Sequence, residues 1–117
     1  MILLFKTEPI PLFYVYDTHL TAHKREWGVL LKPGRAGIRG KKHDALFMSL
    51  WLKRRGGYLA QDGGFDGFYT YFASKGFSFG STLVNWPKLN KYGRNHKLVF
   101  APTVGPGYND TGSNSKL

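Results

Sequence analysis

Four apolar runs, separated by segments that favour helix, constrain what this chain can fold into. Each run is rich in β-branched or aromatic residues, and the four lie at residues 12–16, 45–51, 67–72 and 97–104. Three of them are nearly continuous rather than alternating, which is typical of strands buried on both faces of a parallel sheet. The sequence therefore predicts an α/β protein built on four parallel strands.

Helices are expected between the runs, over residues 18–31, 54–62 and 86–92. The second is expected to be weakened by its glycine pair at 56–57. In the third, Asn85 is expected to cap the first turn, with Pro87 inside it and Gly93 just past the helix end. Strand and helix alternate with a repeat of roughly 30 residues, the spacing of a (β/α)8 barrel, which takes about 250 residues in full. We therefore expect a partial (β/α)8 TIM barrel of about four β/α units.

Several classes of protein are excluded or disfavoured because their motifs are missing. The Gly-x-Gly-x-x-Gly turn of dinucleotide-binding sheets follows none of the predicted strands, which argues against an open, doubly wound sheet. The chain has no cysteine, so disulfides and thiolate-bound zinc are excluded. No stretch approaches the roughly 20 apolar residues that a membrane-spanning helix needs, so we expect no membrane segment in this chain.

The chain is strongly basic, with a net charge of +10. Such charge can neutralise phosphates, so a basic nucleic-acid-binding module is an alternative class. Residues 75–80, Lys-Gly-Phe-Ser-Phe-Gly, also imitate an RNA-recognition or cold-shock motif, although Gly80 stands where a strand residue is needed. No basic run exceeds three residues, and such short runs usually belong to a solvated surface. We therefore do not expect nucleic acid as a partner.

Polar and aromatic side chains follow the predicted strands at their carboxyl ends, which is where the active sites of (β/α)8 barrels lie. Sugar hydroxyl groups need directed donors and acceptors, and sugar ring faces stack on aromatic side chains. A cleft lined by such residues suits sugar recognition. The candidates for substrate binding are Tyr16, Asp17, His19, Tyr71, Tyr108 and Asp110.

Some acidic and histidine side chains have simpler explanations. Asp17 could cap the helix that follows it, and His19 could be an ordinary surface histidine. Asp44 and Asp66 precede their strands, so we expect them in turns at the opposite, structural end of the sheet.

The carboxylates needed for catalysis are not evident. Glycoside hydrolysis usually requires two carboxyl groups that flank the bond. The only two glutamates are Glu8, which precedes the first strand, and Glu26, on a basic helix face. We therefore assign no catalytic residue, and whether this chain is an enzyme stays open.

Three sequence segments are unusual in combination. They are Phe-Tyr-Val-Tyr-Asp at residues 13–17, the Gly-Phe-Asp-Gly-Phe-Tyr-Thr-Tyr-Phe-Ala-Ser stretch that begins at residue 64, and Pro-Thr-Val-Gly-Pro-Gly-Tyr-Asn-Asp-Thr at residues 102–111. Together they resemble glycoside hydrolase family 99, the endo-α-1,2-mannosidases. We take residues 11–111, over which the similarity runs, as a partial family 99 barrel. Residues 1–10 are then a non-core N-terminal segment, and residues 112–117 a divergent tail.

The resemblance implies a retaining glycosidase that cuts an internal α-1,2-mannoside bond in glucosylated high-mannose N-glycans of the Golgi. Its partner is then a mannose-containing oligosaccharide or N-glycan, and no metal or cofactor is implied. The family reacts through the substrate 2-OH, with two glutamates as general base and general acid/base. Residue by residue, Tyr71 resembles the family's active-site tyrosine. Further positions that match the cleft lining are Tyr16, Asp17 and Tyr108.

The chain departs from the family pattern after Thr111. The family's glutamate pair lies in a Glu-Trp-His-Glu segment that is absent here, and residues 112–117 replace an expected Arg-Pro-Trp-Asn segment. The family also more often has tyrosine where His19 stands. We therefore expect an interior fragment that is inactive alone because the catalytic glutamates are absent. The terminal Ser-Lys-Leu matches a peroxisomal signal, which we interpret as coincidence.

Overall fold

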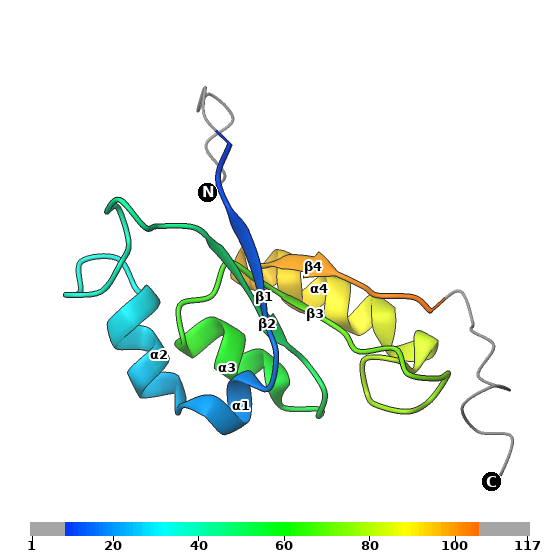
Figure 1. Ribbon diagram of the computed structural model, residues 1–117. Helices are drawn as coiled ribbons and strands as arrows, with labels where there is room; N and C mark the ends of the chain where they lie inside the picture. The colour runs from blue at the N-terminus through cyan, green and yellow to red at the C-terminus, as the bar shows by residue number, and fades with distance from the viewer. Residues whose placement is uncertain (1–8, 106–117) are drawn as a thin grey trace, which may run out of the picture.

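The strands of the sheet follow one another in sequence order. The computed structural model describes residues 9–105 of the chain, and Figure 1 shows its course. The four strands are β1 (Leu12–Val15), β2 (Leu46–Leu50), β3 (Gly67–Tyr69) and β4 (Val99–Ala101). Each pairs in parallel with the next, in the order β1-β2-β3-β4. The prediction of four parallel strands is confirmed, although each strand is shorter than expected.

The helices pack on one face of this sheet. They are α1 (Thr18–Thr21), α2 (Lys24–Leu31), α3 (Gly56–Asp62), the 3-10 helix η1 (Leu83–Asn85) and α4 (Trp86–His96). Leu31 of α2, Ala60 of α3 and Leu89 of α4 belong to one buried cluster. Phe68 of β3 lies in the same cluster and is fully buried. Because side chains from three helices share one cluster with the sheet, the helix layer covers a single face.

The opposite, inner face of the sheet carries a smaller cluster. Met48 and Leu50 of β2 pack there with Tyr69 of β3, and Leu52 and Ala101 lie against them. A doubly wound sheet would place helices on this face and would reverse its strand order. Sequential strands with helices on one face are the arrangement of a (β/α)8 barrel segment. The expectation of a partial barrel with about four β/α units is therefore confirmed.

The first predicted helix is divided in two. α1 ends at Thr21 and α2 begins at Lys24, with His23 as the N-cap residue. The His23 side chain accepts a hydrogen bond from the first turn, and its backbone N–H donates to Glu26 Oε2 at 2.9 Å. This is a capping box, which the sequence does not indicate because histidine is an uncommon cap. Glu26 is thereby engaged in helix capping.

Two helix boundaries at glycines differ from the prediction. α4 continues past Gly93, and a Cβ there would stand 2.8 Å from the Leu98 carbonyl oxygen. The second predicted helix, α3, begins at Gly56 and not at residue 54, and a Cβ on Gly57 would lie 2.5 Å from the Trp51 ring. In both places the close approach of helix and sheet outweighs the low helix propensity of glycine.

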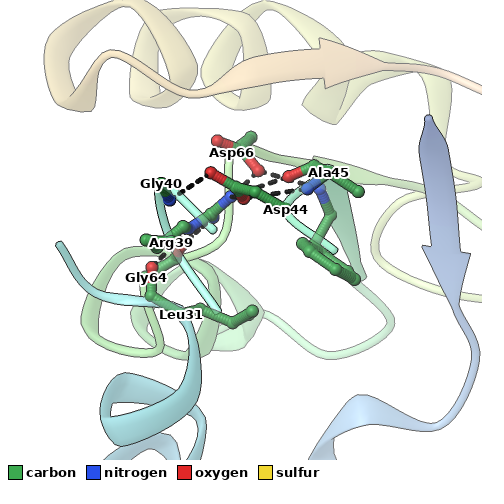
Figure 2. A network of polar contacts seen from close by, with 8 residues as sticks. Leu31, Arg39, Gly40, Asp44, Ala45, Gly64 and Asp66 are labelled. Carbon is green, nitrogen blue, oxygen red and sulfur yellow. Dashed lines mark hydrogen bonds and ion pairs between the residues drawn. The ribbon is translucent and has the colours of Figure 1, made fainter. Parts of the chain in front are cut away.

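Arg39 joins several loops at the amino-terminal end of the sheet, as Figure 2 shows. Its guanidinium donates to Asp44 Oδ1 at 3.2 Å and to Asp66 Oδ2 at 2.9 Å. Its other acceptors are the main-chain carbonyl oxygens of Leu31, Ala45 and Gly64. These five hydrogen bonds match the five N–H donors of a guanidinium, and the side chain is only 13% exposed.

Asp44 and Asp66 lie in turns before their strands, as predicted. Asp44 also accepts from the backbone N–H groups of Gly40 and Ala45, at 2.7 and 2.8 Å. Burial acts to raise the pKa of Asp44, but these hydrogen bonds and Arg39 together outweigh burial and lower the pKa from its ordinary value of 3.8. We refer to Arg39, Asp44 and Asp66 as the arginine network.

Candidate functional site

The chain turns sharply where β1 ends, and this turn presents two of the predicted site residues. Tyr16 follows the strand and is 57% exposed. Asp17 has a left-handed backbone, with a φ of 51°, which aspartate tolerates better than most residues. The Thr18 hydroxyl then points inward, 3.1 Å from the Ser49 hydroxyl, and both side chains are buried. The turn therefore fixes Tyr16 and Asp17 at the carboxyl end of the sheet.

Tyr69, the last residue of β3, contacts this turn from the inner face. Its hydroxyl donates to the Val15 carbonyl oxygen at 3.1 Å, and its ring meets Tyr14 edge-on, with centroids 5.0 Å apart. Burial raises the pKa of Tyr69 to about 12, and negative charge on Tyr16 and Asp17 adds to the increase. The Tyr69 phenol is therefore a neutral hydrogen-bond donor at physiological pH.

Tyr69 was not among the predicted site residues, although the sequence holds a signal for it. Side chains two positions apart in a strand point to the same face of the sheet. Tyr71 was expected at the end of the third strand, so Tyr69 was already placed to support the same edge. The signal is the spacing of the two tyrosines rather than either residue alone.

Three exposed rings form a row at this end of the sheet. The ring centroids of Tyr16 and Tyr71 lie 6.1 Å apart, and those of Tyr71 and Phe77 lie 5.9 Å apart, both edge-to-face. Tyr71 is 39% exposed and Phe77 is 58% exposed. We refer to Tyr16, Tyr71 and Phe77 as the aromatic rim. Exposed rings beside hydroxyl and carboxylate groups can bind sugars by stacking and by hydrogen bonds.

A wide groove opens elsewhere, along the inner face and the amino-terminal end of the sheet. Its volume is about 1490 Å³, and its inner part is lined by Leu12, Tyr14, Met48 and Val99. In a closed barrel this space is filled by side chains from all the strands. We therefore interpret the groove as barrel interior. The aromatic rim lies outside its lining.

Comparisons with known proteins agree with the barrel-like order of the elements. Residues 2–115 match the model of the family described as Glycosyl hydrolase family 99. The chain belongs to glycosyl hydrolase family 99. The match includes every strand and helix described above, and it confirms the resemblance inferred from the three sequence segments.

Animal members of family 99 are similar to most of this chain. It is 44% identical over 103 residues to the glycoprotein endo-alpha-1,2-mannosidase of Rattus norvegicus. It is 45% identical over 103 residues to the glycoprotein endo-alpha-1,2-mannosidase-like protein of Homo sapiens. Each comparison covers 87% of this chain and 22% of the relative. The chain therefore spans about a fifth of the length of these curated relatives.

A solved family 99 structure shares the fold. The GH99 endo-alpha-mannosidase from Bacteroides thetaiotaomicron is similar with a TM-score of 0.80 and 40% sequence identity. The similarity covers 92% of this chain and 31% of that chain. The likeness therefore extends to sequence and fold together, over about a third of the bacterial enzyme.

The other predicted site residues of this family 99 chain differ in what the structure shows of them. His19 is exposed on α1. Asp17 is the N-cap residue of α1 but makes no side-chain capping hydrogen bond, so helix capping does not account for its carboxylate. Tyr108 and Asp110 lie outside the described residues, and their place in the site stays a prediction.

The RNA-like run at residues 75–80 lies in the connection between β3 and η1, not in a strand. Phe79 turns toward the helix layer and stacks on Trp51, with ring centroids 6.4 Å apart and an interplanar angle of 17°. RNA-recognition motifs display their aromatic residues on the surface of a sheet. The run therefore does not form such a surface, and nucleic acid is not indicated.

No metal site or membrane span is found among residues 9–105. No group of three or more histidine, aspartate and glutamate side chains is placed there to bind a metal ion. None of the helices in this part of the chain is long and apolar enough to cross a membrane.

Proposed function

We propose that this chain forms part of the sugar-binding wall of an endo-α-1,2-mannosidase that acts on glucosylated high-mannose N-glycans. The observation that carries the proposal is the aromatic rim at the carboxyl ends of β1 and β3. The names of the relatives give the bond that such a barrel cleaves. The glycan and the Golgi as compartment follow from the family resemblance.

Tyr16 and Tyr71 are suited to contact one mannose residue. A pyranose has an apolar C–H face that stacks on an aromatic ring, and its hydroxyl groups bond to phenol and carboxylate oxygens. Both rings are exposed and adjacent, and Asp17 follows Tyr16 in the left-handed turn. We infer that these three residues contact the substrate. Further candidates are His19, Tyr108 and Asp110.

The described carboxylates do not form a catalytic pair. Glu26 caps α2, Asp62 pairs with Lys24 at 2.9 Å, and two aspartates belong to the arginine network. Among residues 9–105, Asp17 is the carboxylate that lies at the carboxyl end of the sheet. Retaining hydrolysis through the substrate 2-OH needs both a general base and a general acid/base. We therefore propose that this chain binds substrate but does not cleave it alone, and that the acid–base pair lies in other parts of the barrel.

Binding of α-1,2-mannobiose to the 117-residue chain tests the first half of the proposal. Calorimetric or NMR titration is expected to show binding that Tyr71→Ala weakens about tenfold, because a stacking ring and a hydroxyl are lost. Tyr58→Ala is the control, since Tyr58 is also an exposed tyrosine, at 57%, but lies on α3 in the helix layer. Unchanged affinity in Tyr71→Ala, or an equal loss in both variants, would contradict the assignment.

Incubation with a glucosylated mannose oligosaccharide tests the second half. We expect no release of a shorter glycan from the purified chain, because the hydrolysis needs two carboxyl groups that flank the bond and the described residues offer no such pair. Asp17→Asn is the control that distinguishes release by the chain itself from release by a contaminating enzyme. Release by the unmodified chain that disappears in Asp17→Asn would show that the chain performs the chemistry itself.

A further inference from the structure

The two phenylalanines of the loop between β3 and η1 have opposite surroundings. The backbone N–H of Phe79 donates to the Leu52 carbonyl oxygen at 3.2 Å, and the ring stacks on Trp51. Phe77 lies two residues earlier and is 58% exposed. Phe79 therefore anchors the loop to the end of β2, whereas Phe77 is not part of that anchor.

Hydrogen bonds within the loop fix the backbone around Phe77. The Phe77 N–H donates to the Ser74 carbonyl oxygen at 3.1 Å, and the Gly76 N–H donates to the Ser81 carbonyl oxygen at 3.2 Å. The Ser81 hydroxyl, which is fully buried, accepts from the Ser78 N–H at 2.6 Å. These contacts span both sides of Phe77, so its position is set before any ligand binds.

The far side of the loop is fixed to α4 and η1 in the same way. Asn85 Nδ2 donates to the Phe79 carbonyl oxygen at 3.0 Å, in place of the helix cap expected from the sequence. Trp86 Nε1 donates to the Gly80 carbonyl oxygen at 2.7 Å. A ring on a preorganised loop loses little conformational freedom when a ligand stacks on it.

A single exposed apolar residue needs no special explanation, but Phe77 extends a row. Its ring lies edge-to-face with Tyr71, and Tyr71 in turn meets Tyr16. The two centroid separations, 5.9 and 6.1 Å, are nearly equal and comparable to the spacing of neighbouring sugar rings in an oligosaccharide. The rim is therefore long enough for more than one pyranose.

We propose that Phe77 is a stacking position for a second sugar ring, adjacent to the mannose at Tyr71. This inference rests on the proposed function and names the part of the oligosaccharide that the loop would recognise. Stacking on an uncharged ring recognises the C–H face of a pyranose without regard to charge. The contact should therefore be insensitive to salt, unlike binding of a phosphate backbone by the neighbouring Lys75.

Titration of the 117-residue chain with sugars of increasing length tests the inference. The probes are methyl α-D-mannoside, with one ring, and α-1,2-linked mannotriose, with three. Phe77→Ala is expected to leave the affinity for the methyl mannoside within about twofold and to weaken mannotriose about tenfold. Phe77→Trp should keep the mannotriose affinity, because it keeps an aromatic face.

Two further variants separate stacking from loop packing. Phe77→Leu keeps apolar bulk but removes the ring face, so it should weaken mannotriose as Phe77→Ala does. Val84→Ala is the matched control, since Val84 is 77% exposed on η1 and lies outside the aromatic rim. It should change neither affinity.

The outcomes distinguish failure of this inference from failure of the proposed function. Unchanged mannotriose affinity in Phe77→Ala, or equal loss for the short and the long sugar, would overturn the second stacking position while Tyr71 keeps its role. If the unmodified chain binds neither sugar, the proposed function itself fails. Tight, salt-sensitive binding of an oligouridylate that Phe77→Ala abolishes would overturn the sugar in favour of RNA.

Discussion

The two ends of the sheet use their polar and aromatic side chains in opposite ways. At the amino-terminal end, Arg39 directs its five donors at acceptors within the chain and is 13% exposed. At the carboxyl end, Tyr16, Tyr71 and Phe77 contact one another only by their edges and are 39% to 58% exposed. One end is saturated by internal contacts, and the other leaves its ring surfaces accessible.

This difference separates stability from binding. A buried group that has all its hydrogen bonds stabilises the fold, and removing one partner leaves the others unpaired. An exposed ring contributes less to stability, but its surface is available to a ligand. Substitutions in the arginine network should therefore change the free energy of unfolding, and substitutions in the aromatic rim should change sugar affinity.

Removal of Arg39 should have the largest effect on stability. Arg39→Ala leaves Asp44 and Asp66 without their cation and several carbonyl groups without a donor, so we expect a loss of about 3–5 kcal/mol, measured by urea unfolding. Arg39→Lys should restore little, because an ammonium has three donors and no planar fork.

An exposed ion pair provides the control for Arg39. Lys24 and Asp62 also lie 2.9 Å apart, but their side chains are 61% and 41% exposed. Lys24→Ala should therefore destabilise the chain by less than about 1 kcal/mol. Similar losses for Lys24→Ala and Arg39→Ala would show that the arginine network does not hold the amino-terminal end together.

Tyr69 tests the comparison between the two ends of the sheet. It lies beside the aromatic rim, but its hydroxyl is hydrogen-bonded internally, to the Val15 carbonyl oxygen. Its pKa in the folded chain, about 12, exceeds the ordinary value of 10.0. Neutral Tyr69 therefore contributes stability that is complete below pH 10.0 and lost as pH rises through about 12. Tyr69→Phe should flatten this decline in urea unfolding measured at increasing pH.

Tyr92 is the matched residue in the helix layer. Burial, and then the charges of Asp62 and Tyr58, raise the pKa of Tyr92 as well. Tyr92→Phe should therefore remove a smaller part of the alkaline decline than Tyr69→Phe. If the decline is the same in Tyr69→Phe as in the unmodified chain, the Tyr69 hydroxyl does not fix the turn after β1.

The loss of stability at low pH tests the arginine network, at the amino-terminal end of the sheet. The pKa of Asp44 lies below its ordinary value of 3.8, so the carboxylate contributes stability that is present above this pH and lost as the pH falls below it. Asp44→Asn should reduce stability at neutral pH and flatten the acid decline. The loss of stability in Asp44→Asn should be smaller when Arg39 is already replaced by alanine, because Arg39 and Asp44 are hydrogen-bonded to each other. Fully additive losses would contradict their coupling.

Much of the fold could be predicted because it depends on local pattern. The apolar runs gave the strands, and their alternation with helices gave the sequential order. Asp44 and Asp66 could be assigned to turns because they precede strands. The acceptors of Arg39 could not be predicted, because three of them are main-chain carbonyl groups that carry no sequence signature.

The candidate site could be proposed from the sequence only in part, for a similar reason. Tyr16 and Tyr71 could be proposed because they lie at the carboxyl ends of predicted strands and match the family resemblance. Phe77 was missed because its run imitates an RNA motif, and only the fold shows that Phe79 turns inward while Phe77 faces solvent. Tertiary contacts, not local pattern, decide which of two similar residues joins the surface.

The smallest effect on stability is expected for substitutions of Tyr16. These substitutions also separate the contribution of its ring to sugar binding from that of its hydroxyl. Tyr16→Phe keeps the ring that meets Tyr71 and removes only an exposed hydroxyl, so the free energy of unfolding should change by less than about 0.5 kcal/mol. Affinity for α-1,2-mannobiose should fall by about threefold to tenfold if the hydroxyl bonds to the sugar, because a single neutral hydrogen bond contributes about 1 kcal/mol. Tyr16→Ala, which also removes the stacking face, should lose more. Equal affinities for the two variants would mean that the ring of Tyr16 adds nothing and that the rim begins at Tyr71.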